Sequence, residues 1–372
     1  MREGSSPRFI NSIASIDRGA WERCFVDEIE GYDYHRAIEN AGILGFTFGW
    51  YALWRDGVLV CAIPSFTTCY DLATTAQGFV QRVLKSLQRA VPRGLKLTLC
   101  CLGSPETEHC QIGFDPSLST SERKQALAEL LEFWIADAHA KGAGLLGIKD
   151  ICDDDLKRHR GVFERFGFKA VASLPSSKLD IDFTSIDDYL GRLSYATRKD
   201  MRRKLKARSK VDVSFTRNVT EELPEIVEMY RETRARSDWR FEELSGDYFA
   251  TVLNDNPDTA FFALYRSGGE LVAANLIMQN EAQLLDKFFV MRADAGRALN
   301  LYFLSWFVNV ERCLASGLKT FVAGQAAYDT KMRLGCVIEP NWICFRHRNP
   351  LVNALLRAAS PLLAVEQPKS KH

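Results

Sequence analysis

The chain has 372 residues, of which 47% are hydrophobic and 26% are charged. These values are typical of a globular protein with a buried core, and they exclude a disordered or fibrous chain. The length is enough for two domains of ordinary size. The net charge of +1 excludes a surface that is basic throughout, so binding to nucleic acid would need a local patch.

No apolar run reaches the length that spans a bilayer, so we expect no transmembrane segment. The opening residues, MREGSSPRFINS, contain no apolar core of signal-peptide length. None of the 10 cysteines forms a CxxC pair, and most lie in apolar runs, which favours reduced thiols over a disulfide framework. These features predict a cytoplasmic protein, and we expect a bacterial source.

In the first half, strands predicted over residues 46–53 and 58–66 are joined around Asp56-Gly57, a strong hairpin signal. A predicted helix over 119–141 opens with the Ser and Glu of a capping box. The other helices expected in this half span 17–30, 74–91 and 153–166. The other strands expected span 95–102 and 145–151, and further strands lie within 169–183 around a turn at 175–177.

In the second half, a basic helix is predicted over 197–210, and strands over 261–265, 271–278 and 284–291 form a meander. A long apolar helix follows and is stopped by Gly317, because glycine adopts the left-handed conformation at a helix end without a Cβ penalty. The other helices expected in this half span 186–193, 221–236 and 247–254, and one more carries Tyr328 and ends at 334–335. The other strands expected span 211–216, 320–323 and 337–345, and the last of them passes through Pro340.

The two halves look like copies of one fold. Residues 133–151 (FWIADAHAKGAGLLGIKDI) parallel residues 306–324 (WFVNVERCLASGLKTFVAG), each an apolar helix, a glycine and a buried strand. ERFGF, ending at Phe168, and MRLGC, ending at Cys336, match in the same order. Two matches at nearly one offset indicate a duplicated unit. We therefore expect one unit over 1–185, a second over 186–348 and an apolar tail over 349–372.

Three segments carry a resemblance to a known family: LSYATRKDMRRKLK at 193–206, AGRALNLYFL at 295–304 and GQAAYDTKMRLG at 324–335. With the meander and the long helix, the chain resembles bacterial tandem-GNAT proteins of the N-acetyltransferase superfamily, close to the Fem-like peptidyltransferases. The resemblance implies an α/β fold of two tandem GNAT-like (acyl-CoA N-acyltransferase) units, with mixed, mostly antiparallel sheets flanked by helices.

The resemblance also implies a donor site for acyl-CoA or acetyl-CoA at the start of the long helix, where backbone amides favour phosphate. The family's pyrophosphate loop opens with Gln or Arg, but Ala293 stands there. The first half lacks such a loop, because its segment 103–116 is acidic and contains prolines. An ordinary strand-to-helix turn is the alternative. The expected donor-binding residues are Arg292, Gly296, Arg297, Ala298 and Leu299.

Two side chains are the expected catalytic groups. Asp286 lies among apolar neighbours in the strand LLDKFFV, where a carboxylate with a raised pKa would take a proton from an amine. The alternative is a solvated pair with Lys287, although strand alternation puts these two on opposite faces. Tyr328 opens the helix after the last buried strand. The resemblance implies that it protonates the leaving thiolate, and packing is the alternative.

The expected substrate-binding residues are Trp239, Arg240, Gln325 and Lys331. Trp239 and Arg240 form either a substrate clamp in a loop or a plug between two helices. Gln325 follows the buried strand, at the sheet edge where α/β proteins bind ligands. Lys331 would hold a phosphate or a carboxylate, or else point to solvent.

A loop at 106–110 (ETEHC) mixes carboxylate, imidazole and thiol groups, but its spacing matches no zinc pattern, so we expect no metal. A glutamate–histidine acid–base pair in the first half is an alternative.

The segment from Arg198 to Lys210 (residues 198–210) holds eight Lys or Arg in 13 residues. It is a candidate site for the phosphates of CoA or of a tRNA. The alternative is a solvated helix paired with Glu221, Glu222 and Glu225. The apolar tail would cover a core edge, join a second subunit in an oligomer or lie on a membrane surface.

Together these features predict an acyltransferase that moves an acyl group from acyl-CoA to an amine acceptor in the cleft between the two units. The acceptor would be a small molecule or a compound like a peptidoglycan precursor. Catalysis would rest on positioning and proton removal, without a covalent enzyme intermediate. The alternatives are Fem-like aminoacyl transfer from a charged tRNA and a non-catalytic binding protein with the GNAT fold.

Overall fold

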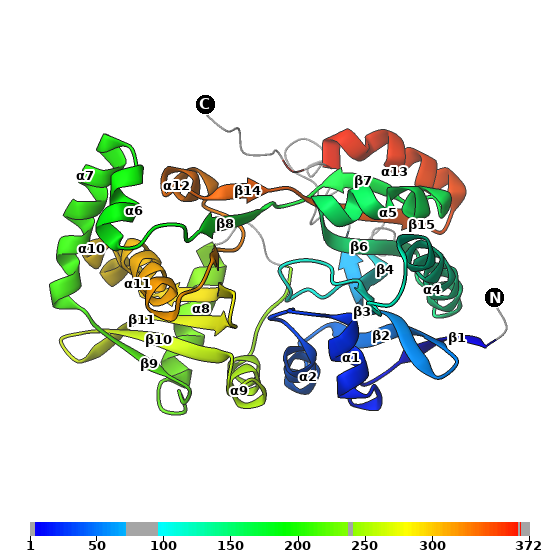
Figure 1. Ribbon diagram of the computed structural model, residues 1–372, viewed down its shortest axis with the longest axis horizontal. Helices are drawn as coiled ribbons and strands as arrows, with labels where there is room; N and C mark the ends of the chain where they lie inside the picture. The colour runs from blue at the N-terminus through cyan, green and yellow to red at the C-terminus, as the bar shows by residue number, and fades with distance from the viewer. Residues whose placement is uncertain (1–3, 72–95, 237–240, 364, 366–372) are drawn as a thin grey trace. The chain divides into compact units, whose positions relative to one another are not determined.

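The computed structural model divides into two compact units, each of them an α/β structure on one mixed sheet (Figure 1). The expected α/β class, with helices flanking mixed sheets, is confirmed. The structure describes residues 4–71, 96–236, 241–363 and 365. Unit 1 comprises residues 1–175 and 340–367, and unit 2 comprises residues 176–339 and 368–372.

Unit 1 contains an eight-stranded sheet in the order β1-β2-β3-β4-β6-β15-β7, with β5 beside β3. Among the described strands, β4 and β6 pair in parallel and the other neighbours are antiparallel. The strands are β1 Ser5–Ile10, β2 Phe46–Arg55, β3 Val58–Asp71, β4 Lys96–Leu102, β5 Gly113–Phe114, β6 Leu145–Cys152, β7 Lys169–Ala172 and β15 Asn341–His347. The helices are η1 Ile13–Ser15, α1 Arg18–Cys24, α2 Tyr32–Ala41, α4 Thr120–Ala140, α5 Asp153–Arg165 and α13 Pro350–Leu363.

Both faces of this sheet are covered. Along β2, Tyr51 and Leu53 join the core that includes Trp134 of α4, whereas Trp50 joins a second core with Trp21 of α1. This alternation is that of a strand with two buried faces. Helix α13 packs on β15 and β7, so most of the apolar tail covers the sheet of unit 1.

Unit 2 contains a seven-stranded sheet in the order β14-β8-β13-β12-β11-β10-β9. Strands β12 and β13 pair in parallel, and the other described neighbours are antiparallel. The strands are β8 Ser176–Asp180, β9 Asp212–Thr216, β10 Ala260–Ser267, β11 Glu270–Gln279, β12 Gln283–Met291, β13 Thr320–Val322 and β14 Val337–Glu339. The helices are α6 Ile186–Arg192, α7 Tyr195–Lys204, η3 Leu205–Lys210, α8 Leu223–Arg236, α9 Gly246–Asp255, α10 Ala293–Leu299, α11 Leu301–Ser316 and α12 Tyr328–Arg333.

The long helix α11 covers one face of this sheet, and α8 and α9 cover the other. Phe289 packs in the core that includes Leu304 and Phe307 of α11. Its neighbour on β12, Phe288, contacts the rings of Tyr230 on α8 and Phe249 on α9. In both units, a long helix connects two strands that run parallel, which agrees with the predicted duplication.

Several local signals in the sequence form as expected. Asp56 and Gly57 have φ values of 50° and 81°, the two positive values that a type I′ hairpin turn requires. Ser119 and Glu122 form the expected capping box. Gly317, with φ at 69°, ends α11. The helix expected over 74–91 lies outside the described residues, and β1, α2 and β5 form without having been predicted from the sequence.

Two prolines stand where the chain leaves one sheet for the other. The single strand predicted over 337–345 is wrong, because at Pro340 it divides into β14, in the sheet of unit 2, and β15, in the sheet of unit 1. Pro175 separates β7 of unit 1 from β8 of unit 2 in the same way. Proline has no N–H for a ladder, so it suits such a junction. The units divide after residues 175 and 339, whereas the boundaries drawn from the sequence follow residues 185 and 348.

This exchange predicts that β14 and β15, although adjacent in sequence, unfold with different units. Trp134→Ala removes a fully buried ring from the core of unit 1 and should cost about 3–5 kcal/mol of its stability. Hydrogen–deuterium exchange should then accelerate in peptides of β15 and stay unchanged in peptides of β14. Phe321→Ala, in the core of unit 2, should give the reverse pattern. An equal response of both strands to either substitution would contradict the division into units.

Candidate active site

Strands β12 and β13 of unit 2 pair for only three residues and then part. The pairing joins Gln283, Leu284 and Leu285 to residues 320–322. At the next residue the ladder between β11 and β12 also shifts: Ile277 faces Asp286, and Leu276 faces Phe288. Lys287 is therefore the extra residue of a β-bulge. Bulges of this kind often lie next to active sites, where they change the direction of a side chain.

Asp286 lies two residues after Leu284, so alternation along β12 puts both residues on the face of the sheet that α11 covers. The bulge shifts the residues that follow it, so Phe289 also lies on this face. The Asp286 side chain turns towards α11, because Asn309 Nδ2 donates a hydrogen bond of 3.1 Å to its Oδ2. Asp286 is half-buried.

Several buried polar side chains share this face of the sheet. Asn275 pairs with Phe289 on β12 and lies in the row next to Asp286. In the part of the chain that the structure describes, both amide atoms of Asn275, Oδ1 of Asn309 and the hydroxyls of Tyr265 and Tyr302 are buried without a hydrogen-bond partner. We call these five residues, Asp286, Asn275, Asn309, Tyr265 and Tyr302, the polar cluster.

The unpaired buried polar atoms of the polar cluster would reduce the stability of a core that had only a structural role. An unpaired buried polar group typically costs about 1–3 kcal/mol, and native proteins contain few of them. Burial and the nearby charge of Asp286 both raise the pKa values of Tyr265 and Tyr302, so these phenols stay protonated and can donate hydrogen bonds. The cluster can therefore bind water or a polar group of a ligand next to a carboxylate.

The expected donor segment is the short helix α10. The N–H of Gly296 donates to the carbonyl of Arg292 at 2.8 Å, so this amide is used within the helix. A Cβ at Gly296 would lie 2.5 Å from Sδ of Met291, so a side chain here would displace the end of that methionine. Arg292 forms ion pairs with Glu225 and Glu228 on α8.

The other residues of the segment differ in exposure. Arg297 is exposed and pairs with Asp294, Ala298 is exposed, and Leu299 packs against the core of unit 2. Of the five expected donor-binding residues, Arg297 and Ala298 therefore present the most surface to a ligand.

Lys331 holds the segment that follows β13. It is 4% exposed, and its Nζ donates to the carbonyl oxygens of Ala323, Gly324 and Gln325 at 2.6, 2.9 and 2.9 Å. These bonds use all three donors of an ammonium group. The next two residues of the segment, at 326 and 327, have positive φ values, which are uncommon for alanine. The ammonium therefore stabilises a strained turn that sets the positions of Gln325 and Tyr328.

Tyr328 begins α12 and, like Gln325, is half-buried. The remaining two expected substrate-binding residues, Trp239 and Arg240, lie outside the described residues.

A second polar network lies in unit 1, in the loop that follows β4. His35 Nε2 lies 2.7 Å from Gln111 Oε1, and Gln111 Nε2 donates to Glu28 Oε2 at 3.3 Å. His109 Nε2 lies 3.3 Å from Glu28 Oε1. Burial lowers the pKa of His109, but its hydrogen bond to Glu28 and the charges of Glu28 and Glu30 outweigh this and raise it to about 9. His109 and Glu28 are therefore a charged pair at neutral pH.

No group of three or more His, Cys, Asp or Glu side chains that could hold a metal occurs within the described ranges. Over the same residues, no helix is both long and apolar enough to cross a membrane.

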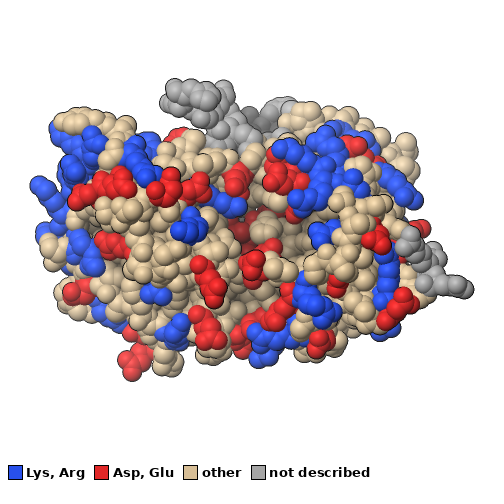
Figure 2. Space-filling view, in the orientation of Figure 1, with Lys and Arg blue, Asp and Glu red and all other residues tan. Residues whose placement is uncertain are grey.

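The basic segment forms α7 and η3, and the ion pairs of Arg202, Arg203 and Lys204 are with Asp187 and Asp200 rather than with the glutamates expected as partners. Glu222 pairs with Arg266 instead, and Glu225 pairs with Arg292. Figure 2 shows Lys and Arg gathered over α7 at the upper left. We call the exposed cations of this segment the basic surface: Lys199, Arg202, Arg203, Lys206, Arg208 and Lys210.

The buried ammonium of Lys331 yields a stability prediction. Lys331→Met leaves three carbonyls without their charged donor, so the free energy of unfolding of unit 2 should fall by at least about 3 kcal/mol. Urea denaturation followed by circular dichroism measures this loss. Lys319→Met, at an exposed lysine of the same unit, should change stability by less than about 0.5 kcal/mol. Equal effects of the two substitutions would show that the three hydrogen bonds do not stabilise the turn.

Comparison with solved structures supports the tandem-GNAT fold. The chain is similar to FemX (TM-score 0.56, 14% identity, 84% of this chain and 91% of that one). It is also similar to the C-terminal domain of a "Putative Lysylphosphatidylglycerol Synthetase" from Agrobacterium fabrum (TM-score 0.55, 13% identity, 95% and 98%). A tandem GNAT protein from the clavulanic acid biosynthesis pathway is similar with a TM-score of 0.52 and 12% identity, and the match covers 93% of this chain and 99% of that one. At these identities the likeness concerns the fold, and it confirms two GNAT-like units.

Among curated proteins, the chain is 22% identical over 348 residues to a Mycobacterium tuberculosis protein named "Putative 8-amino-7-oxononanoate synthase 2". The match covers 91% of this chain and 44% of the relative, so the chain spans less than half the length of the curated relatives it matches. A family model described as peptidoglycan biosynthesis/recognition matches residues 119–360, which is more than half of the chain. The chain belongs to the FemAB-like family.

Proposed function

We propose that this protein is an acyltransferase that moves an acyl group to an amine at the polar cluster of unit 2. The observation that carries the proposal is the position of Asp286, at a bulge where β12 and β13 part, hydrogen-bonded to Asn309. Membership of the FemAB-like family and the fold shared with FemX and a tandem GNAT protein support it.

In the proposed reaction, Asp286 takes the proton of the amine as its nitrogen attacks the carbonyl carbon of the donor. A C–N bond forms, and the bond from the carbonyl carbon to the donor's sulfur or oxygen breaks. Tyr328 gives its phenolic proton to that leaving atom, and the proton held by Asp286 passes through solvent to restore the phenol. Asn309 orients Asp286, and Lys331 positions Gln325 and Tyr328. No covalent enzyme intermediate is needed, so the protein contributes orientation and proton transfer.

The first candidate donor is an acyl-CoA such as acetyl-CoA. Its phosphates would lie near α10, where Arg297 is exposed and Ala298 leaves room for a close approach. In this proposal unit 2 is catalytic and unit 1 is a degenerate copy. Arg292 would lie near the phosphates, but its charge is offset by its ion pairs with Glu225 and Glu228, so Arg297 would contribute more.

The second candidate donor is an aminoacyl-tRNA, and the basic surface favours it. Its six cations are exposed on one helix and the turn that follows, and salt-sensitive contacts with phosphates suit such an array. The ester bond of this donor would be broken by the same attack of an amine. The acceptor in either case would be an amine of a small molecule or of a compound like a peptidoglycan precursor, and Trp239, Arg240 and Gln325 remain proposed contacts to it. We place the reaction in the cytoplasm.

Parallel titrations separate the two donors. A thermal-shift titration with acetyl-CoA should raise the unfolding temperature in a dose-dependent way if the thioester is the donor, because ligand binding to the native state stabilises it. Arg297→Gln should weaken that effect. A substitution at Gly296 is less suitable, because a side chain there would displace the end of the Met291 side chain.

Fluorescence titration with bulk tRNA at several salt concentrations tests the alternative. If tRNA is the donor, neutralising Arg202, Arg203 and Lys206 together should weaken binding and reduce the salt slope by about two to three. Neutralising three exposed cations elsewhere in unit 2, Arg231, Arg236 and Lys319, should leave the slope unchanged. Binding of neither acetyl-CoA nor tRNA would contradict the proposed function.

A further inference from the structure

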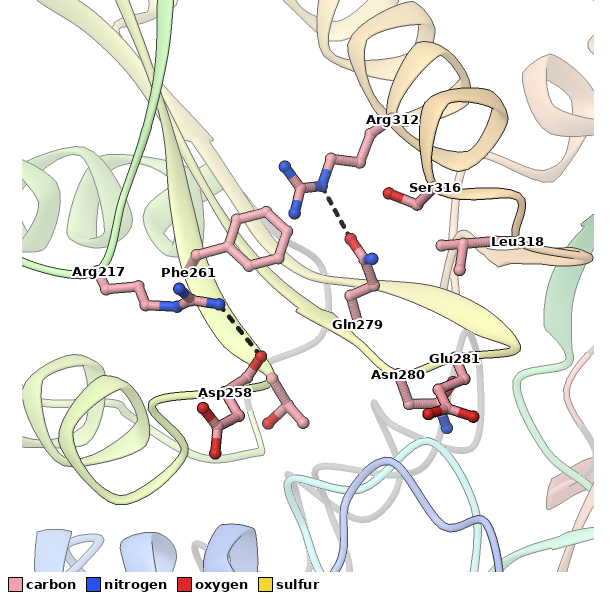
Figure 3. Close-up of a pocket in the computed structure, with 10 residues that line it drawn as sticks. Arg217, Asp258, Phe261, Gln279, Asn280, Glu281, Arg312, Ser316 and Leu318 are labelled. Carbon is pink, nitrogen blue, oxygen red and sulfur yellow. Dashed lines mark hydrogen bonds between the residues drawn. The ribbon is translucent and has the colours of Figure 1, made fainter.

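Unit 2 has a pocket of about 550 Å³ at the end of the sheet where β10 begins and β11 ends (Figure 3). This is within the range of volumes of small-molecule sites. Two arginines are its principal charges: Arg217, which follows β9, and Arg312, in the last part of α11. Phe261, Gln279, Thr259 and Ser316 also line the pocket.

The guanidinium of Arg312 is held in a fixed orientation. It lies over the ring of Phe261 at 4.4 Å and over the ring of Phe215 at 4.9 Å from the ring centres. Its Nε donates to Gln279 Oε1 at 2.8 Å. The two aromatic faces and the amide restrain the group, which leaves the two Nη atoms as the fork that binds carboxylate or phosphate.

Arg217 adds a second positive charge near the first. Its Nη2 donates to the backbone carbonyl of Asp258 at 3.2 Å. Figure 3 shows the two guanidinium groups on either side of the ring of Phe261. Burial lowers the pKa of Arg312, and the like charge of Arg217 lowers it further. Throughout the described parts of the chain, neither arginine forms an ion pair, so neighbouring carboxylates do not neutralise these two charges.

We propose that this pocket binds an oxyanion, the carboxylate or phosphate group of a small ligand, between Arg217 and Arg312. Two guanidinium groups that repel each other and form no ion pair within the described residues gain most from a shared anion. The hydroxyls of Thr259 and Ser316 can donate further hydrogen bonds, and the apolar side of the pocket can contact the carbon skeleton of the ligand.

The carboxylates at the rim restrict the class of ligand. Asp258 and Glu281 line the pocket, and Figure 3 shows both on the side away from the Arg312 guanidinium. A second negative charge on the ligand would approach them and be repelled. The site should therefore prefer a ligand with a single oxyanion and a neutral or cationic remainder over a polyanion.

The pocket lies on the same face of the sheet as the polar cluster. Phe261 stands opposite Ile277, and Ile277 stands opposite Asp286, so these three residues form one row. Arg312 follows Asn309 by one turn of α11.

The binding of an oxyanion does not depend on the proposed transfer reaction, and it can be tested without a donor or an acceptor.

Titration of the full-length protein with inorganic phosphate and, separately, with acetate tests the proposal. The Nε–Hε resonance of Arg312 should shift and saturate with a dissociation constant of about 10 mM or lower, at a constant ionic strength of about 0.1 M. The tighter of the two anions identifies the ligand group as phosphate or carboxylate. Saturable binding of neither would overturn the proposal.

Three variants make the test specific. Arg217→Gln should weaken binding about tenfold or more, since a hydrogen bond to a charged group is worth about 1.5–3 kcal/mol. Its side chain is exposed, so the fold should persist. Arg312→Lys keeps the charge but loses the fork and should also weaken binding. Arg231→Gln removes an equal charge from an exposed site on α8 and should leave binding unchanged. Binding by Arg217→Gln that equals the wild-type value would overturn the proposal.

Discussion

The parting of β12 from β13 is the constraint on which the rest of unit 2 depends. Parallel pairing stops after Leu285, and the next residue, Asp286, accepts a hydrogen bond from Asn309 of α11. On the other side of the gap, the ammonium of Lys331 fixes the segment after β13 through three carbonyl oxygens. The hydrogen bonds of Asn309 and Lys331 fix Asp286 and the segment after β13 without help from a ligand, so little ordering is needed when a substrate binds.

The polar cluster and the pocket lined by Arg217 and Arg312 lie on one face of the sheet, and α11 contributes residues to both. Asn309 contacts Asp286, and Arg312 lies one turn further along the helix. The apolar side chains of α11 anchor it in the core, so its polar residues are held as rigidly as the sheet beneath them. In this way the single helix α11 presents a neutral amide, that of Asn309, to the polar cluster and a cation, that of Arg312, to the neighbouring pocket.

Much of the fold could be predicted from the sequence, because its signals are local. The Asp56-Gly57 hairpin, the capping box at Ser119, the glycine that ends α11 and the repeated helix–glycine–strand segments all depend on neighbouring residues. The exchange of strands at Pro340 could not be predicted, because the alternation of a strand does not identify the sheet that it joins.

The site was predicted less completely, since its contacts join distant residues. Asp286 could be chosen from its apolar surroundings, but neither the bulge nor Asn309, 23 residues away, leaves a local signal. Lys331 appears in the sequence as an ordinary helical lysine, yet it is buried against three carbonyls. Arg217 and Arg312 line the same pocket, but one lies in a loop and the other in a helix far along the chain, so the sequence gives no local signal of their proximity.

The central claim is that Asp286 removes the proton of the amine. The most direct measurement is the single-turnover rate of acyl transfer by Asp286→Asn, with whichever donor binds. The account predicts unchanged donor affinity and a rate about 10²–10⁴-fold lower, the usual contribution of a general base. Asp212→Asn, which removes an exposed carboxylate from β9, should retain the wild-type rate. A rate for Asp286→Asn within a few-fold of wild type would contradict the claim and move the chemistry away from the polar cluster.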